Sequence, residues 1–236
     1  MSRKLGILGG MGPLATVEFM QKIIAQTPAR NDQQHIPMLV RNIPQIPDRT
    51  DFLIGNGLDP FPALKKGFEE LQQAGAECIV IPCNTAHYWY PRLQAISKVH
   101  TINIIDSVVT EAKQRGYSQV GILATSATMM TRMYQEKLAQ CGIDAIETTE
   151  HEQQAVMEGI CAVKAGDVKR GQRLMAPVFE AMLSRGANAV VFGCTEIPVA
   201  LAKQGLQHPD QCLDSLEILA TECISWAQDE FHELVA

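Results

Sequence analysis

The chain has 236 residues, which is enough for one large hydrophobic core or two modest ones. Hydrophobic residues make up 46% of it and charged residues 19%, a balance that is typical of globular proteins and excludes a disordered or fibrous chain. Lys and Arg number 20 against 26 Asp and Glu, and the net charge of -6 argues against nucleic acid or an anionic membrane surface as a partner. We therefore expect a small-molecule ligand or another subunit.

Short β-branched or apolar runs alternate with longer amphipathic stretches, a pattern that predicts βα units and a parallel sheet. In chain order, the predicted strands are 4–8, 38–42, 78–81, 101–104, 119–123, 144–147 and 189–192. The predicted helices, again in chain order, are 14–26, 60–74, 107–115, 127–141, 152–165, 167–185 and 215–234. The loop 43–60 is long and rich in Pro and Gly. Such a loop is typical of a binding or lid segment, although a plain excursion of the chain fits it about as well.

No run of about 20 apolar residues occurs in the sequence, so no transmembrane helix is predicted. The apolar stretch after the basic N-terminal residues is too brief for a secretory signal. The seven cysteines are an odd number without a C-x-x-C pair, which fits neither a disulfide framework nor a zinc ribbon. Reduced thiols in a cytoplasm are the natural interpretation.

The most informative feature of the sequence is an internal repeat. The stretch 68–83 aligns without a gap on the stretch 179–194. The identical pairs are Phe68 with Phe179, Glu69 with Glu180, Gly75 with Gly186, Ala76 with Ala187, Val80 with Val191 and Cys83 with Cys194. Two shorter matches flank this alignment: Gly6-Ile7-Leu8 recurs as Gly121-Ile122-Leu123, and Asp106-Ser107, expected just before one helix, recurs as Asp214-Ser215 before another.

The repeat predicts an α/β protein of two pseudo-symmetric lobes, each a parallel sheet flanked by helices, with the active site in the cleft between them. The lobes divide near Asp106, so that residues 1–105 with 209–236 form the first lobe and residues 106–208 form the second. The helix after the second Asp-Ser pair then returns to the first lobe.

The two matched cysteines each follow a predicted strand and precede a presumed helix start. Functional loops of a parallel sheet lie at the carboxyl ends of its strands. A thiolate at a helix N-terminus is stabilised by the helix dipole and by unpaired N–H groups, which predicts a lowered thiol pKa for Cys83 and Cys194. A lone cysteine at a strand end is more often a small buried hydrophobic residue, but two at matched positions of a repeat weaken that interpretation.

A reaction that uses two equivalent acid/base groups on opposing lobes is amino-acid racemisation. When the two enantiomers are held by their carboxylate, ammonium and side chain in the same way, they present the α-hydrogen on opposite faces. A racemase therefore needs one base on each face, one as thiolate and the other as thiol, and the pair titrates as a coupled unit.

At these residues the chain resembles the aspartate/glutamate racemases that work without pyridoxal phosphate. The resemblance covers nearly the whole length and rests on three motifs: Gly9-Gly10-Met11-Gly12-Pro13, Pro82-Cys83-Asn84-Thr85-Ala86-His87 and Gly193-Cys194-Thr195-Glu196. It implies catalysis by Cys83 and Cys194, an amino-acid substrate, no cofactor and no metal. We also expect a cytoplasmic homodimer without nucleic-acid or membrane partners.

The resemblance also implies substrate-binding residues. Asn84, Thr85 and Thr195 match the residues that hold the α-carboxylate, Met11 lies in the first motif beside them, and Arg49 and Lys164 match the basic pair for the side-chain carboxylate. Glutamate racemases usually have His where this chain has Glu196, which favours aspartate without excluding glutamate. From the residues alone, Thr125, Ser126 and Thr128 are equally well interpreted as hydroxyl donors to substrate or as a helix N-cap. Arg49 and Lys164, taken alone, resemble solvated surface charges.

Several alternatives stay open. The Gly cluster 6–12 suggests phosphate binding, but it lacks the G-x-G-x-x-G spacing of a dinucleotide site. His87 with the two cysteines forms an incomplete zinc set, for which a hydrogen-bonded structural histidine is the default. At the level of function, the rivals are an isomerase or decarboxylase of a small dicarboxylate on the same scaffold and a binding protein without turnover.

Overall fold

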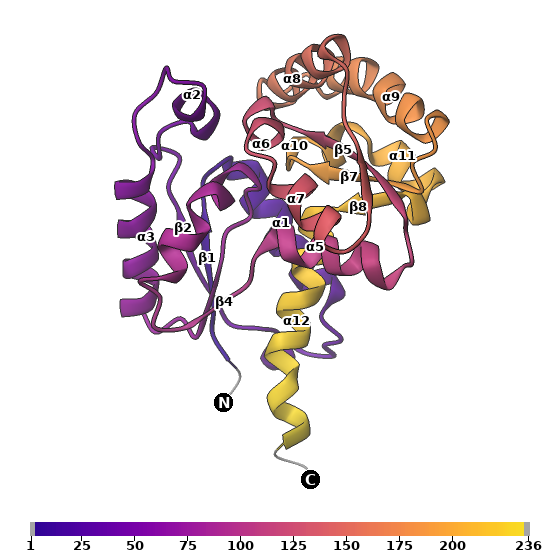
Figure 1. Cartoon of the computed structure of the whole chain (residues 1–236). Coiled ribbons are helices and arrows are strands. Elements are labelled where there is room, and N and C mark those ends of the chain that lie inside the picture. Colours follow the sequence, from indigo (N-terminus) through magenta and orange to yellow (C-terminus); the bar gives the residue numbers. More distant parts are fainter. Residues whose placement is uncertain (1–2, 234–236) are drawn as a thin grey trace. The chain divides into compact units, whose positions relative to one another are not determined.

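The computed structural model describes residues 3–233, and these form two compact units. One unit contains the residues up to 104 together with those from 216 onward, and the other contains residues 105–215. Figure 1 colours the chain along its sequence, so the first unit carries the indigo elements and most of the final yellow helix. The proposed domains, residues 1–105 with 209–236 and residues 106–208, differ from these units mainly in residues 209–215, which lie with the second unit.

The first unit is built on a four-stranded parallel sheet in the order β2-β1-β3-β4. The strands are β1 (Leu5–Gly9), β2 (Met38–Asn42), β3 (Cys78–Val80) and β4 (His100–Thr101). The helices are α1 (Pro13–Gln26), α2 (Arg49–Leu53), α3 (Phe61–Gln73), α4 (Tyr90–Gln94) and α12 (Ser215–Glu233), with 3-10 turns η1 (Asp32–Gln34) and η2 (Thr85–Trp89). Leu64, Phe68 and Leu71 recur along α3 at helical spacing, and this buried face joins the core around Leu8 and Ile79.

The second unit repeats the arrangement with a parallel sheet in the order β6-β5-β7-β8. The strands are β5 (Gln119–Ala124), β6 (Asp144–Ile146), β7 (Ala189–Gly193) and β8 (Cys212–Asp214). The helices are α5 (Ile104–Gln114), α6 (Ser126–Met130), α7 (Met133–Gln140), α8 (Glu150–Lys164), α9 (Val168–Ser184), α10 (Glu196–Ala200) and α11 (Ala202–Gln207), with the 3-10 turn η3 (Pro209–Gln211). Its core packs Met175, Phe179 and Met182 of α9 with Val156 and Ile160 of α8.

The two sheets have the same strand order, with β1 and β5 in second place and β3 and β7 in third. The prediction of two pseudo-symmetric α/β lobes, each a parallel sheet flanked by helices, is therefore confirmed. Cys83 follows β3 and Cys194 follows β7, the corresponding strands of the two sheets. Among the described residues, no helix combines the length and the apolar character needed to cross a membrane.

Several element boundaries differ from the predicted ones. The helix expected at 127–141 is two helices, α6 and α7, because Arg132 adopts a left-handed conformation with φ 54° and interrupts the helical path. The strand expected at 101–104 ends at Thr101, and Ile104 already begins α5, three residues before the predicted start. Strand β8 and the short helix α2 were not predicted, because three to five residues are too few to show a period. Leu234, the predicted end of the last helix, lies outside the described residues.

Candidate active site

Cys83 lies three residues beyond the end of β3, in a turn shaped by proline. Pro82 has no N–H to continue the sheet and restricts the residue before it, so β3 stops at Val80. The backbone N–H of Cys83 donates to the Ile81 carbonyl at 2.8 Å, which reverses the chain around Pro82. The Cys83 side chain is 6% exposed and belongs to the same core cluster as Met11. The fold of the first unit thus holds this thiol at the edge of a packed core.

His87 braces the Cys83 turn through its ring. Its Nδ1 lies 2.8 Å from the Cys83 carbonyl oxygen, and the backbone N–H of Ile104 donates to its Nε2 at 3.2 Å. A carbonyl only accepts and an amide N–H only donates, so Nδ1 carries the hydrogen and Nε2 accepts. The ring also stacks on Tyr90 with 5.4 Å between centroids. His87 is therefore a buried, neutral, hydrogen-bonded histidine, which agrees with its default interpretation.

The neighbouring motif residues of the first unit are also buried. Asn84 and Thr85 directly follow Cys83, and Met11 follows β1. The glycines before Met11 have a steric role, because a Cβ on Gly10 would lie 2.4 Å from the backbone of Ile43, and its φ of 100° disfavours other residues. The Gly10 N–H donates to the Thr16 hydroxyl at 2.9 Å. The Gly cluster thus packs the end of β1 closely against the chain that leaves β2.

Arg49 begins α2 inside the long Pro- and Gly-rich loop. The Asp48 side chain caps this helix by accepting from the N–H groups of Thr50 and Asp51. Arg49 is only 8% exposed, and its Nη1 donates to the carbonyls of Ile46 and Pro47 at 3.2 and 3.0 Å. Its buried Nε has no hydrogen-bond partner among the described residues. A guanidinium with an unsatisfied buried N–H is suited to an incoming carboxylate, and the surface-charge interpretation of Arg49 is wrong.

In the second unit, Cys194 directly follows β7 and contacts a carboxylate. Its Sγ donates to Glu196 Oε2 at 3.0 Å, and the Thr195 hydroxyl donates to the same oxygen at 3.1 Å. Cys194, Thr195 and Glu196 are all buried, with Cys194 at 7% exposed. Burial, together with the charge and the hydrogen bond of Glu196, raises the pKa of the Cys194 thiol well above its usual range, whereas the positive charge of Lys164 acts in the opposite direction.

The predicted lowering of the thiol pKa is therefore wrong for Cys194. The helix that follows it, α10, has five residues and contributes too small a dipole to offset burial beside an anion. At neutral pH this raised pKa favours the protonated form of the Cys194 thiol. In the sequence Glu196 stands out only as a departure from the glutamate racemase motif, and its place two residues after the cysteine is the one signal for this contact.

The hydroxyl cluster after β5 acts in part as a helix cap. Thr125 is the N-cap of α6, since its hydroxyl accepts from the Thr128 N–H at 3.2 Å, and the two threonine hydroxyls lie 3.0 Å apart. The capping interpretation thus holds for Thr125. Ser126, between them, is half-buried. Lys164, the last residue of α8, is exposed, yet its charge acts on Cys194 of the same unit.

The zinc alternative depends on whether the ring nitrogens of His87 are available to a metal ion. Over the described part of the chain, no three His, Cys, Asp or Glu side chains form a group that could hold a metal ion. Both ring nitrogens of His87 are engaged with backbone groups.

Comparison with known proteins agrees with the resemblance seen in the motifs. The model of the Asp/Glu/hydantoin racemase family matches residues 8–223. The chain belongs to this family. It is an isomerase of the amino-acid racemase type.

Individual relatives extend over nearly the whole chain. The broad specificity amino-acid racemase RacX of Bacillus subtilis (strain 168) is 29% identical over 230 residues, covering 94% of this chain and 96% of RacX. The structure of Picrophilus torridus aspartate racemase is 33% identical with a TM-score of 0.87, covering 95% of this chain and 94% of that one. An aspartate racemase homologue from Pyrococcus horikoshii OT3 is 25% identical with a TM-score of 0.76, covering 96% and 100%.

Proposed function

We propose that this racemase interconverts the enantiomers of aspartate without a cofactor, with Cys83 and Cys194 as its two acid/base groups. The observation that carries the proposal is that corresponding strands of two repeated units each lead into a buried thiol, in a chain of the racemase family. One thiolate removes the α-hydrogen as a proton, and the other thiol delivers a proton to the opposite face. The product leaves with the roles of the two sulfur atoms exchanged, so the reverse reaction restores them.

The environment of Cys194 supports an assignment of the resting protonation states. A buried thiol that donates to Glu196 is the acid of the pair at rest. Cys83 then acts as the base in the first direction and removes the α-proton. In the opposite direction Cys194, left as the thiolate by the forward step, removes the α-proton, and Cys83 delivers the proton that it took up. The mechanism requires both sulfur atoms to reach one α-carbon.

The intermediate adds negative charge to a substrate that already carries an α-carboxylate, so preorganised donors are required. Asn84 and Thr85 beside one thiol and Thr195 beside the other supply such donors, with Met11 in the adjoining turn. For the side-chain carboxylate, the unpartnered Nε of buried Arg49 supports a direct ion pair. Lys164 adds a second positive charge on the Cys194 side.

Aspartate is proposed over other amino acids because of Arg49 and the likeness to the aspartate racemase of Picrophilus torridus. A second candidate is racemisation of a broad range of amino acids, which the likeness to RacX favours. We also propose a cytoplasmic homodimer, since all seven cysteines are free thiols, the form that a reducing compartment maintains. Light scattering after size exclusion measures the oligomeric state.

The decisive experiment follows the α-proton of L-aspartate by NMR in deuterated buffer, with chiral chromatography on the same sample. We expect loss of the α-proton signal together with formation of D-aspartate. Equal rates with alanine or lysine would favour the broad-range candidate. Turnover of maleate or an arylmalonate instead of aspartate would identify an isomerase or decarboxylase. Thermal stabilisation by aspartate without proton exchange would identify a binding protein and overturn the proposal.

A further inference from the structure

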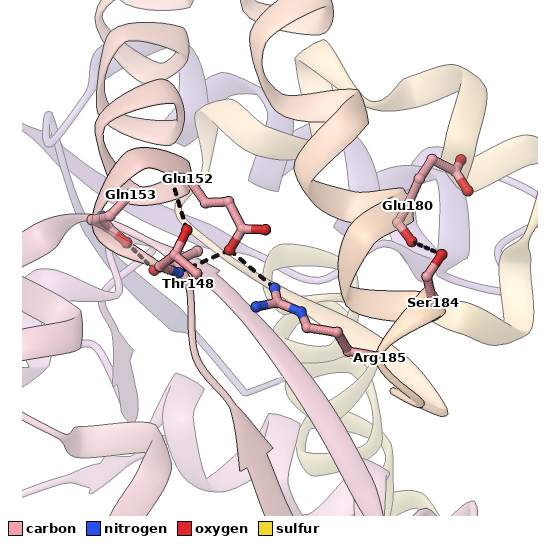
Figure 2. Close-up of polar contacts among 7 residues, drawn as sticks. Thr148, Glu152, Gln153, Glu180, Ser184 and Arg185 are labelled. Atoms are coloured by element: carbon pink, nitrogen blue, oxygen red, sulfur yellow. Dashed lines mark hydrogen bonds and ion pairs between the residues drawn. The ribbon is translucent and has the colours of Figure 1, made fainter.

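Gln153, near the start of α8, ties the end of β5 to the hydroxyl of Ser126. Its Nε2 donates to the Ala124 carbonyl at 3.0 Å and to Ser126 Oγ at 3.2 Å. Its Oε1 accepts from the Thr148 hydroxyl at 2.6 Å, an interaction marked in Figure 2. All of these residues belong to the second unit.

These partners fix the orientation of the Gln153 amide. The Ala124 carbonyl only accepts, so the NH2 group must face it, and the amide oxygen must then face Thr148. Both hydrogens of the NH2 group are used, one on Ala124 and the other on Ser126. The amide therefore presents a pure donor to the serine.

The donor group of Gln153 limits the hydrogen bonds that the Ser126 hydroxyl can make. An oxygen that accepts from Gln153 must direct its own hydrogen elsewhere, toward another acceptor. Ser126 is half-buried and lies two residues beyond Ala124, which pairs in register with Gly193, the residue before Cys194. Ser126 and Cys194 thus leave neighbouring strands at the same edge of the sheet. A serine hydroxyl that can only donate a hydrogen bond at this edge is suited to binding a carboxylate.

Helix α8 gives Gln153 a firm base. Thr149 and Glu152 form a capping box at its first turn, and Glu152 also pairs with Arg185 at 3.0 Å, as Figure 2 shows. One turn beyond Gln153, the sulfur of Met157 accepts from the Ser126 N–H at 3.2 Å. Gln153 and Met157, on one face of α8, therefore both hold the Ser126 segment in place.

We propose that Gln153 is a positioning residue that restricts the Ser126 hydroxyl to donating a hydrogen bond to a carboxylate of the substrate. The inference rests on the proposed function, because it assigns a role within the same site. Gln153 itself touches no substrate; it acts through Ser126.

The test replaces Gln153 by Glu, which keeps the shape but turns the donor into an acceptor. The Ser126 hydroxyl then donates to the new carboxylate and is lost to the substrate. We expect KM for aspartate to rise about tenfold, the effect of losing a hydrogen bond to a charged group, with kcat changed by less than about twofold. Gln153→Met, which lets the hydroxyl rotate, should raise KM less. Gln154→Glu is the matched control, because Gln154 is exposed and its amide donates to Glu158 of its own helix.

A double-mutant cycle separates this role from simple charge repulsion or misfolding. Ser126→Ala should raise KM as much as Gln153→Glu, and the two together should raise it no further. Additive effects, a similar loss in Gln154→Glu, or an unchanged KM in Gln153→Glu with native circular dichroism would overturn the inference. Calorimetric binding of succinate, which cannot be racemised, gives a second measurement with the same expected pattern. If the wild type and the variants bind succinate with this pattern but the wild type does not racemise aspartate, only the proposed function is contradicted. If the wild type binds no dicarboxylate, the proposed function and the role of Gln153 are both contradicted.

Discussion

The Cys83 and Cys194 segments occupy corresponding places after β3 and β7, yet the two thiols have chemically different neighbours. At Cys83 the supporting side chain, His87, binds the backbone carbonyl. At Cys194 the supporting side chain, Glu196, accepts directly from the sulfur. The repeat thus conserves the position of the thiol, while burial and the Glu196 carboxylate, which lies outside the matched residues, raise the pKa of the Cys194 thiol. The proposed division of the pair into an acid and a base rests on this difference in neighbours.

The largest expected effect removes either sulfur. Cys83→Ser and Cys194→Ser should each lower the rate of aspartate racemisation by about a hundredfold to ten-thousandfold, because an alcohol is a far weaker acid than a thiol. Chiral chromatography measures the rate, and circular dichroism checks the fold. Cys161→Ser, at an exposed cysteine of α8, is the control and should keep full activity. Near-native racemisation by one of the two serine variants would remove that cysteine from the mechanism.

The next effect concerns Arg49, buried in the first unit, against Lys164, exposed in the second. Arg49→Gln should cost roughly 2 to 5 kcal/mol of transition-state stabilisation toward aspartate, as for a lost buried charge pair. Activity on alanine should barely change, so the informative quantity is the ratio of kcat/KM for the two substrates. Arg30→Gln, at an exposed arginine, is the matched control. An unchanged ratio in Arg49→Gln would leave the aspartate assignment without this support.

A direct test of the asymmetry removes the charge of Glu196. Glu196→Gln should lower the pKa of the Cys194 thiol, because the anion beside it is gone. Iodoacetamide should then alkylate Cys194 at a lower pH than in the wild type, while the pH profile of Cys83, followed by mass spectrometry in the same sample, stays where it was. We expect racemisation to fall by about tenfold, the size of a charge-assisted hydrogen bond. If the Cys194 profile does not move, Glu196 does not control its protonation.

The corresponding change at the other cysteine should act on the fold more than on acid/base chemistry. His87→Leu leaves the Cys83 carbonyl and the Ile104 N–H without their ring partner, at a cost of about 1 to 3 kcal/mol. A urea titration should show a lower midpoint, and the alkylation profile of Cys194 should remain as in the wild type. His151→Leu, at an exposed histidine, provides the control. A native midpoint in His87→Leu would contradict the bracing role.

Much of what the two cysteine segments have in common can be predicted from the sequence, and the features that cannot be predicted have physical causes. The repeat located both cysteines at the ends of corresponding strands, since strand patterns and identical residues recur over long stretches. The sign of the Cys194 pKa shift depends on where the Glu196 side chain turns after the strand, which no periodicity encodes. The burial of Arg49 depends on α2, a helix of five residues that is too short for a hydrophobic pattern. The contact of Gln153 with Ser126 joins segments 27 residues apart, and only the fold brings them together.

The smallest expected effect is that of a chelator. It tests whether Cys83 and Cys194 bind a metal ion instead of acting as an acid and a base. A zinc ion held by the two cysteines and His87 would need a free ring nitrogen, but Nδ1 donates to the Cys83 carbonyl and Nε2 accepts from Ile104. Exhaustive dialysis against EDTA should therefore leave the racemisation rate unchanged, provided that a reductant protects the thiols from oxidation. Metal analysis by mass spectrometry accompanies the assay. Activity lost on dialysis and restored by zinc would mean that the ring turns away from its backbone partners, and the acid and base assignment of the two cysteines would have to be replaced by coordination chemistry.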